Sequence, residues 1–339
     1  MSSIPQAEVA QKRLHGQFFT TTNPFNVDPF HKWLKAIPCL EEMVLLEPFA
    51  GANNIVCMIQ DLGYNNQWSC FDIQPAGEEL NASGVLVQQR DSLQNYPLGY
   101  QVAITNPPYL AKNSATRRGL PFSGDKYDDL YKVSLDTMLQ HTPYVAAIIP
   151  ESFLTQGLFH SRLHAVISLT CKMFEDTEVP VCLALFVPSE EKSDPADFQI
   201  FAENRLLGTY SDLKKHIETF VGPGIPWRFN DPHGLIGLHA VDSQSGPSIR
   251  FVLGAEIPPS DVKESSRSIT RIGGDIPPSQ VVKIIAEANR LLTTRREKTK
   301  DTFMTAFKGL RKDGRYRRRL DFSQAREILN LAARNAGAM

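Results

Sequence analysis

The sequence predicts an α/β protein with a doubly wound, mostly parallel sheet, followed by a small β-rich module and a basic helical tail. Short apolar runs alternate with helical patterns through the first 190 residues, as in repeated strand–helix–strand units. The run Val145–Ile149 is apolar without polar alternation, as expected of a strand covered on both faces. Composition changes at the polar stretch Ser189–Pro195. We therefore predict three regions, over residues 1–190, 191–275 and 276–339.

The apolar runs place the elements of the first region. Strands are predicted at residues 44–46, 69–73, 85–87, 102–104, 145–149 and 181–187, and helices at 54–62 and 131–139. In the first of these helices, Ile55, Met58, Ile59 and Leu62 recur at helical spacing.

The second and third regions differ from the first in composition. Residues 196–275 are rich in Gly and Pro turns, with short extended segments such as Ser248–Leu253. Pro277-Pro278-Ser279 then opens a helix with an apolar face. The polar continuation of this helix leads into a basic segment.

Composition restricts the class of protein. The 339-residue chain has no apolar run long enough for a membrane span and no apolar stretch typical of a signal peptide. Its five cysteines are odd in number, widely spaced and without a CxxC pair. This pattern favours reduced thiols in the cytoplasm over a disulfide framework or a zinc site. We expect no bound metal and no membrane partner.

The net charge of −1 conceals an asymmetry. Residues 290–319 contain 12 Lys or Arg against three acids, a local charge of +9, so the rest of the chain carries −10. A basic segment on an acidic body is typical of a part that binds polyanions. The clustered Arg315, Arg317, Arg318 and Arg319 suit phosphate contacts. The alternatives are a solvated helix, or a segment that folds back on the acidic body.

The strongest chemical signal is Asn106-Pro107-Pro108-Tyr109, directly after the predicted strand 102–104. The prolines fix the backbone and donate no hydrogen bond. The amide oxygen of Asn106 and the carbonyl of Pro107 can therefore both accept from one planar –NH2 group. Such acceptors favour a pyramidal nitrogen whose lone pair points at an electrophile. Tyr109 offers a π-face on which a base can stack.

A second constellation suits a ligand with a ribose and an adenine. The small-residue loop Glu47–Asn53 follows the first strand and lets backbone approach a ligand at the carboxyl edge of the sheet. Asp72 ends the second strand, where its carboxylate can take both ribose hydroxyls. Asp91 follows the third strand and can accept from an adenine amine. Each acid alone would more often be a cap or a surface charge.

These motifs resemble those of the N6-adenine DNA methyltransferases, over residues 14–188. Gly16–Thr20 resembles the motif in which a threonine, here Thr20, helps to hold the methionine carboxylate of S-adenosylmethionine. Glu47–Asn53 resembles the (D/E)PFAGxG cofactor loop, with Asn53 in place of the usual glycine. Asn106–Tyr109 resembles the (D/N)PP(Y/F) catalytic motif, and Phe174 the aromatic that covers the other face of a flipped base.

The resemblance implies a function and a set of residues. It implies methyl transfer from S-adenosylmethionine to the N6 amine of a flipped adenine in double-stranded DNA, in the gamma class with a C-terminal target-recognition module. A cognate restriction endonuclease is a further expected partner. The implied cofactor contacts are Thr20, Glu47, Phe49, Ala50, Gly51, Asp72, Ile73, Asp91, Ser92 and Asn106. Lys112, Arg117 and Arg118 follow the catalytic turn and can contact phosphates beside the flipped nucleotide.

Two other functions stay open at this point. The same turn serves methyltransferases that act on RNA adenine or on protein glutamine, because both targets present a planar –NH2 group. A non-catalytic DNA-binding protein on the same fold is the second alternative. Asn106, Asp72 and Asp91 argue against it, since binding alone does not need them.

Overall fold

The computed structural model describes residues 23–122, 124, 126–169 and 179–339. The chain divides into two compact units, Met1–Thr209 and Tyr210–Met339. The predicted Gly16–Thr20 motif and Phe174 lie outside the described residues.

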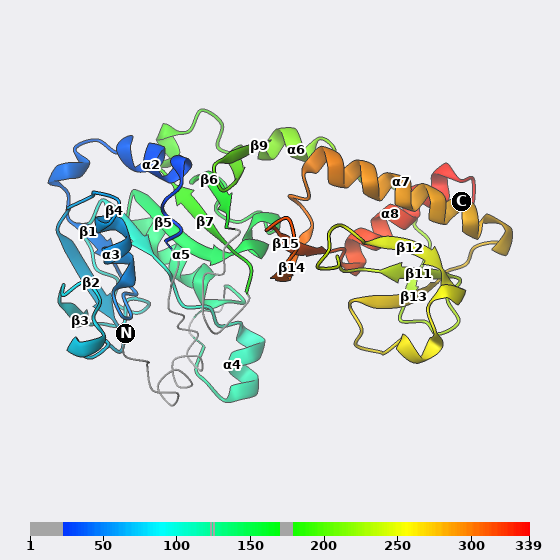
Figure 1. Cartoon of the computed structure of the whole chain (residues 1–339), viewed down its shortest axis with the longest axis horizontal. Coiled ribbons are helices and arrows are strands. Elements are labelled where there is room, and N and C mark those ends of the chain that lie inside the picture. Colours follow the sequence, from blue (N-terminus) through cyan, green and yellow to red (C-terminus); the bar gives the residue numbers. More distant parts are fainter. Residues whose placement is uncertain (1–22, 123, 125, 170–178) are drawn as a thin grey trace. The chain divides into compact units, whose positions relative to one another are not determined.

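The first unit is built on a nine-stranded sheet with the order β3-β2-β1-β4-β5-β7-β6-β8-β9 (Figure 1). Its first five strands in that order are parallel to one another, β7 is antiparallel to both β5 and β6, and β9 is antiparallel to β8. The strands are β1 Leu45–Glu47, β2 Trp68–Asp72, β3 Val87–Gln89, β4 Val102–Thr105, β5 Tyr144–Pro150, β6 Leu163–Ser168, β7 Val181–Phe186, β8 Gln199–Ala202 and β9 Arg205–Thr209.

Side chains on both faces of this sheet are buried. Alternate residues of a strand point to opposite faces, and both Ile104 and its neighbour Ala103 are fully buried, as are Val145 and Ala146. The helices are α2 Asp28–Lys35, α3 Asn54–Gln60, α4 Lys112–Arg118 and α5 Leu130–His141. Side chains of α2 and α3 share one apolar core with β1, β4, β5 and β7. The predicted fold class, an α/β protein with a doubly wound, mostly parallel sheet, is confirmed.

The first unit extends beyond the polar stretch at which the sequence placed a boundary. After the short 3-10 helix Ser189–Glu191, strand β8 pairs with β6 and β9 pairs with β8. The sheet therefore continues to Thr209, past the predicted boundary at residue 190.

The second unit combines a four-stranded antiparallel sheet with two long helices. The sheet order is β10-β13-β11-β12, from Arg228–Phe229, Ile269–Gly273, Ile236–His239 and Arg250–Leu253 respectively. The helices are α6 Tyr210–Lys214, α7 Val281–Thr299 and α8 Phe322–Asn335. Sheet residues such as Ile236 share one core with Ile284 of α7 and Ile328 of α8. Residues 210–275 and the helices after them therefore form one folded body.

Between α7 and α8 the basic segment forms a β-hairpin where the sequence predicted a helical tail. Helix α7 ends at Thr299, and both Lys300 and Asp301 have left-handed backbone, with φ of 55° and 63°. Strand β14 (Thr305–Leu310) then pairs antiparallel with β15 (Tyr316–Arg319). In β15, buried residues alternate with half-buried ones. This alternation is typical of a strand that packs on one face. The segment therefore forms a strand although it is rich in arginine.

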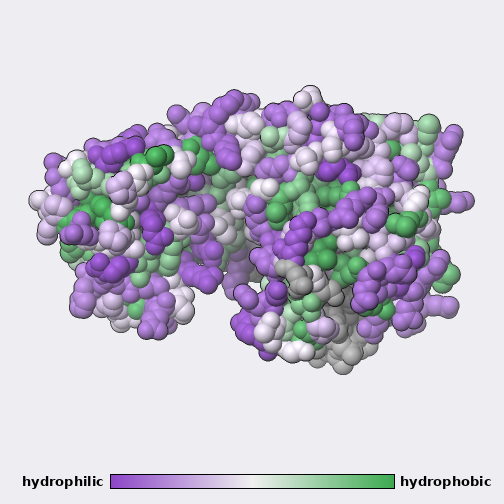
Figure 2. All heavy atoms as spheres, turned by 180° about the vertical axis from the view of Figure 1, so that it is seen from behind, coloured by the Kyte–Doolittle hydropathy of each residue, from purple (hydrophilic) through white to green (hydrophobic). Residues whose placement is uncertain are grey.

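The surface of each unit mixes apolar and polar side chains. Figure 2 shows hydrophobic residues as separate patches among hydrophilic ones on the visible face. The large apolar side chains that are exposed, such as Leu86 and Val221, are far apart in the sequence, and scattered exposed residues of this kind are normal. Within the described part of the chain, no helix is long and apolar enough to cross a membrane.

Candidate functional site

Three neighbouring strands of the first unit end at the residues that the sequence singled out. Strand β1 ends at Glu47, β2 at Asp72 and β4 at Thr105, just before Asn106. Because β1 lies between β2 and β4 and all three are parallel, their carboxyl ends meet at one edge of the sheet (Figure 1). Ligands of open α/β sheets bind at this edge.

Glu47 joins the loop after β1 to the end of β4. Its Oε1 accepts hydrogen bonds from the backbone of Phe49, at 3.0 Å, and from the hydroxyl of Thr105, at 2.5 Å. The side chain is fully buried, and its Oε2 has no hydrogen-bond partner among the described residues. Burial raises the pKa of this carboxyl to about 8, because a buried carboxylate loses the hydration that stabilises its charge.

The loop after β1 needs left-handed backbone at two positions. Gly51 has φ of 54° and Asn53 has φ of 64°. Asparagine tolerates this region better than other side chains do, which explains how Asn53 can stand where the related motif has glycine. The amide nitrogen of Asn53 also donates to the hydroxyl of Ser83, at 2.7 Å, and to the carbonyl of Val85, at 3.0 Å. The substitution therefore adds side-chain contacts that hold the loop.

Asp72 is bonded to this loop. Its Oδ2 accepts from the backbone N–H of Gly51, at 2.9 Å, and its Oδ1 from that of Gln74, at 2.8 Å. A carboxylate offers about four acceptor positions, so both bonds are compatible with further bonds to ribose hydroxyls. The neighbouring Ile73 is 55% exposed, an unusual position for an apolar side chain beside a buried carboxylate.

Asp91 and Ser92 begin the turn after β3. Oδ1 of Asp91 accepts from the backbone N–H groups of Leu93 and Gln94, at 3.0 and 3.2 Å. This is the capping geometry of an Asx turn, so Asp91 organises its own loop whatever else it binds. Ser92 is buried, and its hydroxyl makes no hydrogen bond to the described residues.

The Tyr109 hydroxyl fixes the Asn106–Tyr109 turn. This hydroxyl lies within hydrogen-bond distance of two oxygens, the Asn106 side-chain amide at 2.5 Å and the Ile148 carbonyl of β5 at 2.6 Å. One hydroxyl proton serves both acceptors, so the contact orients the Asn106 amide relative to the sheet. The Tyr109 ring also lies edge-on to Tyr131, with ring centroids 6.3 Å apart. Pro107 is buried, whereas Asn106 and Pro108 are partly exposed.

Asp129 also supports this turn, a role that was not predicted from the sequence. Its Oδ1 accepts from the backbone N–H of Leu110, at 3.1 Å, and its side chain caps the N-terminus of α5. Burial raises the pKa of the Asp129 carboxyl to about 6. The available signal was an aspartate directly before an apolar helical pattern, which is typical of an N-cap.

The residues predicted to bind DNA fall into two groups. Lys112, Arg117 and Arg118 lie on α4 of the first unit and are exposed. Arg315, Arg317, Arg318 and Arg319 lie on or beside the β14–β15 hairpin of the second unit. Arg318 is only 4% exposed. The prediction that its side chain contacts DNA at the surface is therefore wrong.

Comparison with known proteins gave structural likenesses alone. No protein-family profile and no curated protein matches the sequence. The methyltransferase subunit of a type I restriction-modification system from Streptococcus thermophilus is similar with TM-score 0.39 and 15% identity, over 58% of this chain and 52% of that one. A putative class I S-adenosylmethionine-dependent methyltransferase from Listeria monocytogenes has TM-score 0.41 and 14% identity, over 55% and 65%.

The M protein of the type I restriction enzyme EcoKI is a third similar structure. It has TM-score 0.38 and 12% identity, over 54% of this chain and 48% of its own. The aligned regions thus span about half to two thirds of these three chains.

Proposed function

We propose that this chain is an S-adenosylmethionine-dependent methyltransferase that methylates the N6 amine of adenine in DNA. One observation carries the proposal. The Asn106–Tyr109 turn leaves β4 at the sheet edge where Glu47 and Asp72 end the two neighbouring strands. An acceptor for a planar amine therefore lies beside a loop and a carboxylate suited to a nucleoside cofactor.

The residues at this edge fit the cofactor. The left-handed Gly51 and Asn53 shape a loop of small residues that lets a ligand approach the backbone. Asp72 supplies acceptors for the ribose hydroxyls. The buried hydroxyl of Ser92, which no described residue engages, offers a polar contact, and Ile73 an apolar surface. Thr20, outside the described residues, is the proposed contact for the methionine carboxylate.

The chain's own groups act mainly on the target amine. When bound, S-adenosylmethionine supplies a sulfonium methyl group as electrophile. The Asn106 amide oxygen and the Pro107 carbonyl accept hydrogen bonds from the –NH2 group of the target and direct its lone pair. Both acceptors also stabilise the positive charge that develops on nitrogen. The Tyr109 hydroxyl holds the Asn106 amide in place before the target arrives.

The target base must leave the duplex to reach this turn. Rotating a nucleotide out costs about a few kcal/mol, which stacking and phosphate contacts must offset. We propose Tyr109 and Phe174 as the stacking residues, and Lys112, Arg117 and Arg118 of α4 as contacts for the neighbouring phosphates. The second unit is the proposed target-recognition part.

The test measures the product. Purified protein is incubated with isotope-labelled S-adenosylmethionine and either mixed duplex DNA, duplex RNA or a glutamine peptide, and digested nucleosides are examined by mass spectrometry. We expect N6-methyl-2′-deoxyadenosine from DNA and no methylated product from RNA or the peptide, with Asn106→Ala inactive and the exposed-loop variant Asn95→Ala active. Methylated RNA or glutamine without methylated DNA would replace the proposed substrate, and transfer to none of them would overturn the proposal.

A further inference from the structure

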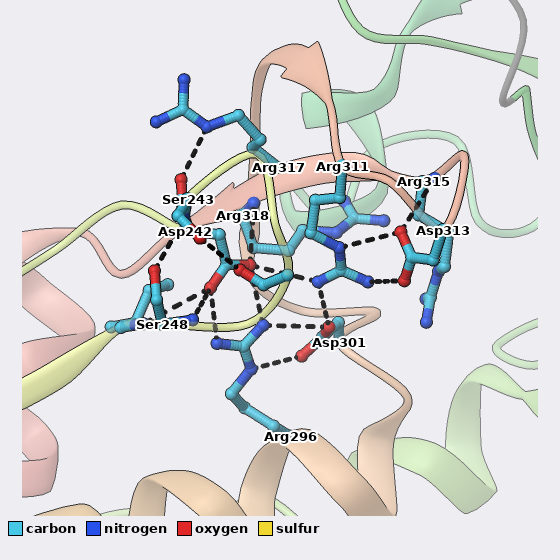
Figure 3. A network of polar contacts seen from close by, with 12 residues as sticks. Asp242, Ser243, Ser248, Arg296, Asp301, Arg311, Asp313, Arg315, Arg317 and Arg318 are labelled. Atoms are coloured by element: carbon cyan, nitrogen blue, oxygen red, sulfur yellow. Dashed lines mark hydrogen bonds and ion pairs between the residues drawn. The ribbon is translucent and has the colours of Figure 1, made fainter.

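Several arginines of the basic segment, residues 290–319, form ion pairs with carboxylates inside the second unit. Arg296 of α7 makes a bidentate pair with the buried carboxylate of Asp242, at 2.9 and 2.8 Å. Its Nε donates to Asp301 at 2.7 Å, and Arg311 donates to Asp242 at 3.2 Å (Figure 3). These two arginines therefore stabilise the folded second unit. Both belong to the segment with a local charge of +9.

Two other clustered arginines make hydrogen bonds within the second unit. The backbone N–H of Arg318 donates to Asp242 Oδ2 at 3.3 Å, and its side chain is buried. Arg315 donates from its guanidinium to the carbonyl of Lys300 at 2.9 Å and from its backbone to Asp313 at 3.2 Å. Both residues thus hold the hairpin to α7 and to its own turn.

Arg317 and Arg319 lie on the opposite face of β15. Successive residues of a strand alternate between faces, and in β15 the buried Tyr316 and Arg318 alternate with the half-buried Arg317 and Arg319. The register pairs Arg319 with Thr305 and Arg317 with Phe307 on β14. This face of the hairpin therefore carries two arginines and an aromatic ring.

The Arg317 guanidinium is held in place without an ion pair to any described residue. It lies over the Phe307 ring, 5.3 Å from the centroid, and its Nε donates to the backbone carbonyl of Asp242 at 2.6 Å. Figure 3 shows its terminal nitrogens pointing away from the carboxylates of the network. A cation fixed at its base with its outer nitrogens directed outward is preorganised for an anion.

Arg319 has a second cation beside it. Leu320 donates to the Ala240 carbonyl at 2.8 Å, and Ala240 donates to that of Ser268 at 2.7 Å. The backbone segments that carry Arg319 and Arg267 are thus linked through Ala240, and the charge of Arg267 acts on the Arg319 guanidinium. Burial and this neighbouring charge lower the pKa of the Arg319 guanidinium.

The charge of the Asp321 carboxylate acts on Arg319, but Asp321 forms no ion pair with that residue. The closest acid in sequence, Asp321, caps α8 through Gln324, at 2.9 Å, and accepts from Thr305, at 3.3 Å. Within the described residues, no acid forms an ion pair with Arg319 or Arg267, and the buried Nε of Arg319 has no hydrogen-bond partner. Two like charges held together in this way are stabilised by an anion that contacts both.

We infer that Arg267, Arg317 and Arg319 form a contact surface for the phosphate backbone of DNA, whereas Arg315 and Arg318 maintain the hairpin. The inference rests on the proposed function for its choice of DNA. Guanidinium groups match phosphate oxygens in geometry as well as charge, and backbone contacts bind every sequence alike.

The experiment compares two full-length variants with the same loss of charge. Arg267→Gln, Arg317→Gln and Arg319→Gln are combined in one variant. Exposed basic residues elsewhere, Lys35→Gln, Arg205→Gln and Lys283→Gln, are combined in the control. The affinity for labelled duplex DNA of mixed sequence is measured across a salt series. We expect the first variant to bind about 10-fold or more weakly. Its slope of log affinity against log salt should flatten by up to about 3.

The outcomes separate the surface from the proposed reaction. If the slope of the first variant equals that of the control, the surface is overturned while methylation by the wild type still stands. If the wild type binds DNA through this surface but transfers no methyl group, the reaction is overturned and the surface stands. Equal or tighter binding of the matching RNA duplex would overturn DNA as the partner. A thermal melt of each variant checks that the second unit remains folded.

Discussion

The backbone N–H of Gly51 donates a 2.9 Å hydrogen bond to Oδ2 of Asp72 and so ties the loop after β1 to the last residue of β2. Asp72 is buried, and Gly51 has a positive φ of 54°. The loop and the carboxylate are therefore set relative to each other before any ligand binds. We expect substitutions at either position to affect the binding of a nucleoside cofactor.

Asp72→Ala should weaken S-adenosylmethionine binding. The variant loses charge-assisted hydrogen bonds to the ribose, worth about 1.5–3 kcal/mol, and releases Gly51. Isothermal titration calorimetry measures the affinity, and circular dichroism checks the fold. The exposed Asp61→Ala is the control. An unchanged affinity in a folded Asp72→Ala protein would assign Asp72 a structural role only.

Asn106→Ala should lower turnover with little effect on cofactor affinity. It removes one of two acceptors on the target amine, an interaction used mainly in the transition state. Deletion of one comparable donor in an oxyanion hole costs about 10²-fold in turnover, and we expect a similar loss. Single-turnover methyl transfer to DNA measures it, with Asn95→Ala as control. Near wild-type turnover of Asn106→Ala would refute the proposed role of the turn.

Glu47 makes stability depend on pH in an unusual direction. Burial raises the pKa of its carboxyl to about 8 in the folded protein, above the value of about 4.3 for an unfolded chain. Between these two pH values the carboxyl is ionised in the unfolded chain and protonated in the folded protein. The contribution of Glu47 to the free energy of unfolding therefore falls as pH rises from about 4.3 to 8. The effect is on the order of a few kcal/mol.

Glu47→Gln keeps the shape of the side chain and removes this titration. Its unfolding free energy relative to wild type should therefore improve as pH rises through that window. Denaturant unfolding at the two ends of the window measures the difference, with the exposed Glu42→Gln as control. A constant difference between variant and wild type would show that Glu47 is ionised throughout.

Asp242→Asn should destabilise the second unit. The carboxylate of Asp242 is fully buried and bonded to Arg296 and Arg311, so its loss leaves buried cations with fewer partners. Removing one partner of a buried ion pair costs about 3–5 kcal/mol. Denaturant unfolding compares the variant with the exposed Asp261→Asn. If the free energy of unfolding falls no more than in the control, Asp301 and Asp313 are sufficient partners for Arg296 and Arg311.

Much of the first unit could be predicted because buried parallel strands are continuous apolar runs. The runs at 102–104 and 145–149 lie within β4 and β5, and the turn Asn106–Tyr109 follows its strand directly. Strands β6, β8 and β9 were not predicted. In β8 and β9, half-buried or exposed positions outnumber buried ones, and such strands lack a clear apolar signal. Strand β9 is the edge strand of the sheet and β8 is its neighbour.

Sequence alone determined the order of the motifs and the chemistry that each side chain can offer, since both are properties of the chain itself. Which charges face solvent depends on how the chain folds. Asp242 and Arg296 are 54 residues apart in sequence, and no local pattern reports that they pair. A buried arginine and an exposed one have the same charge in the sequence. They differ in the carboxylates that the fold brings to them, because burial requires such partners and exposure does not.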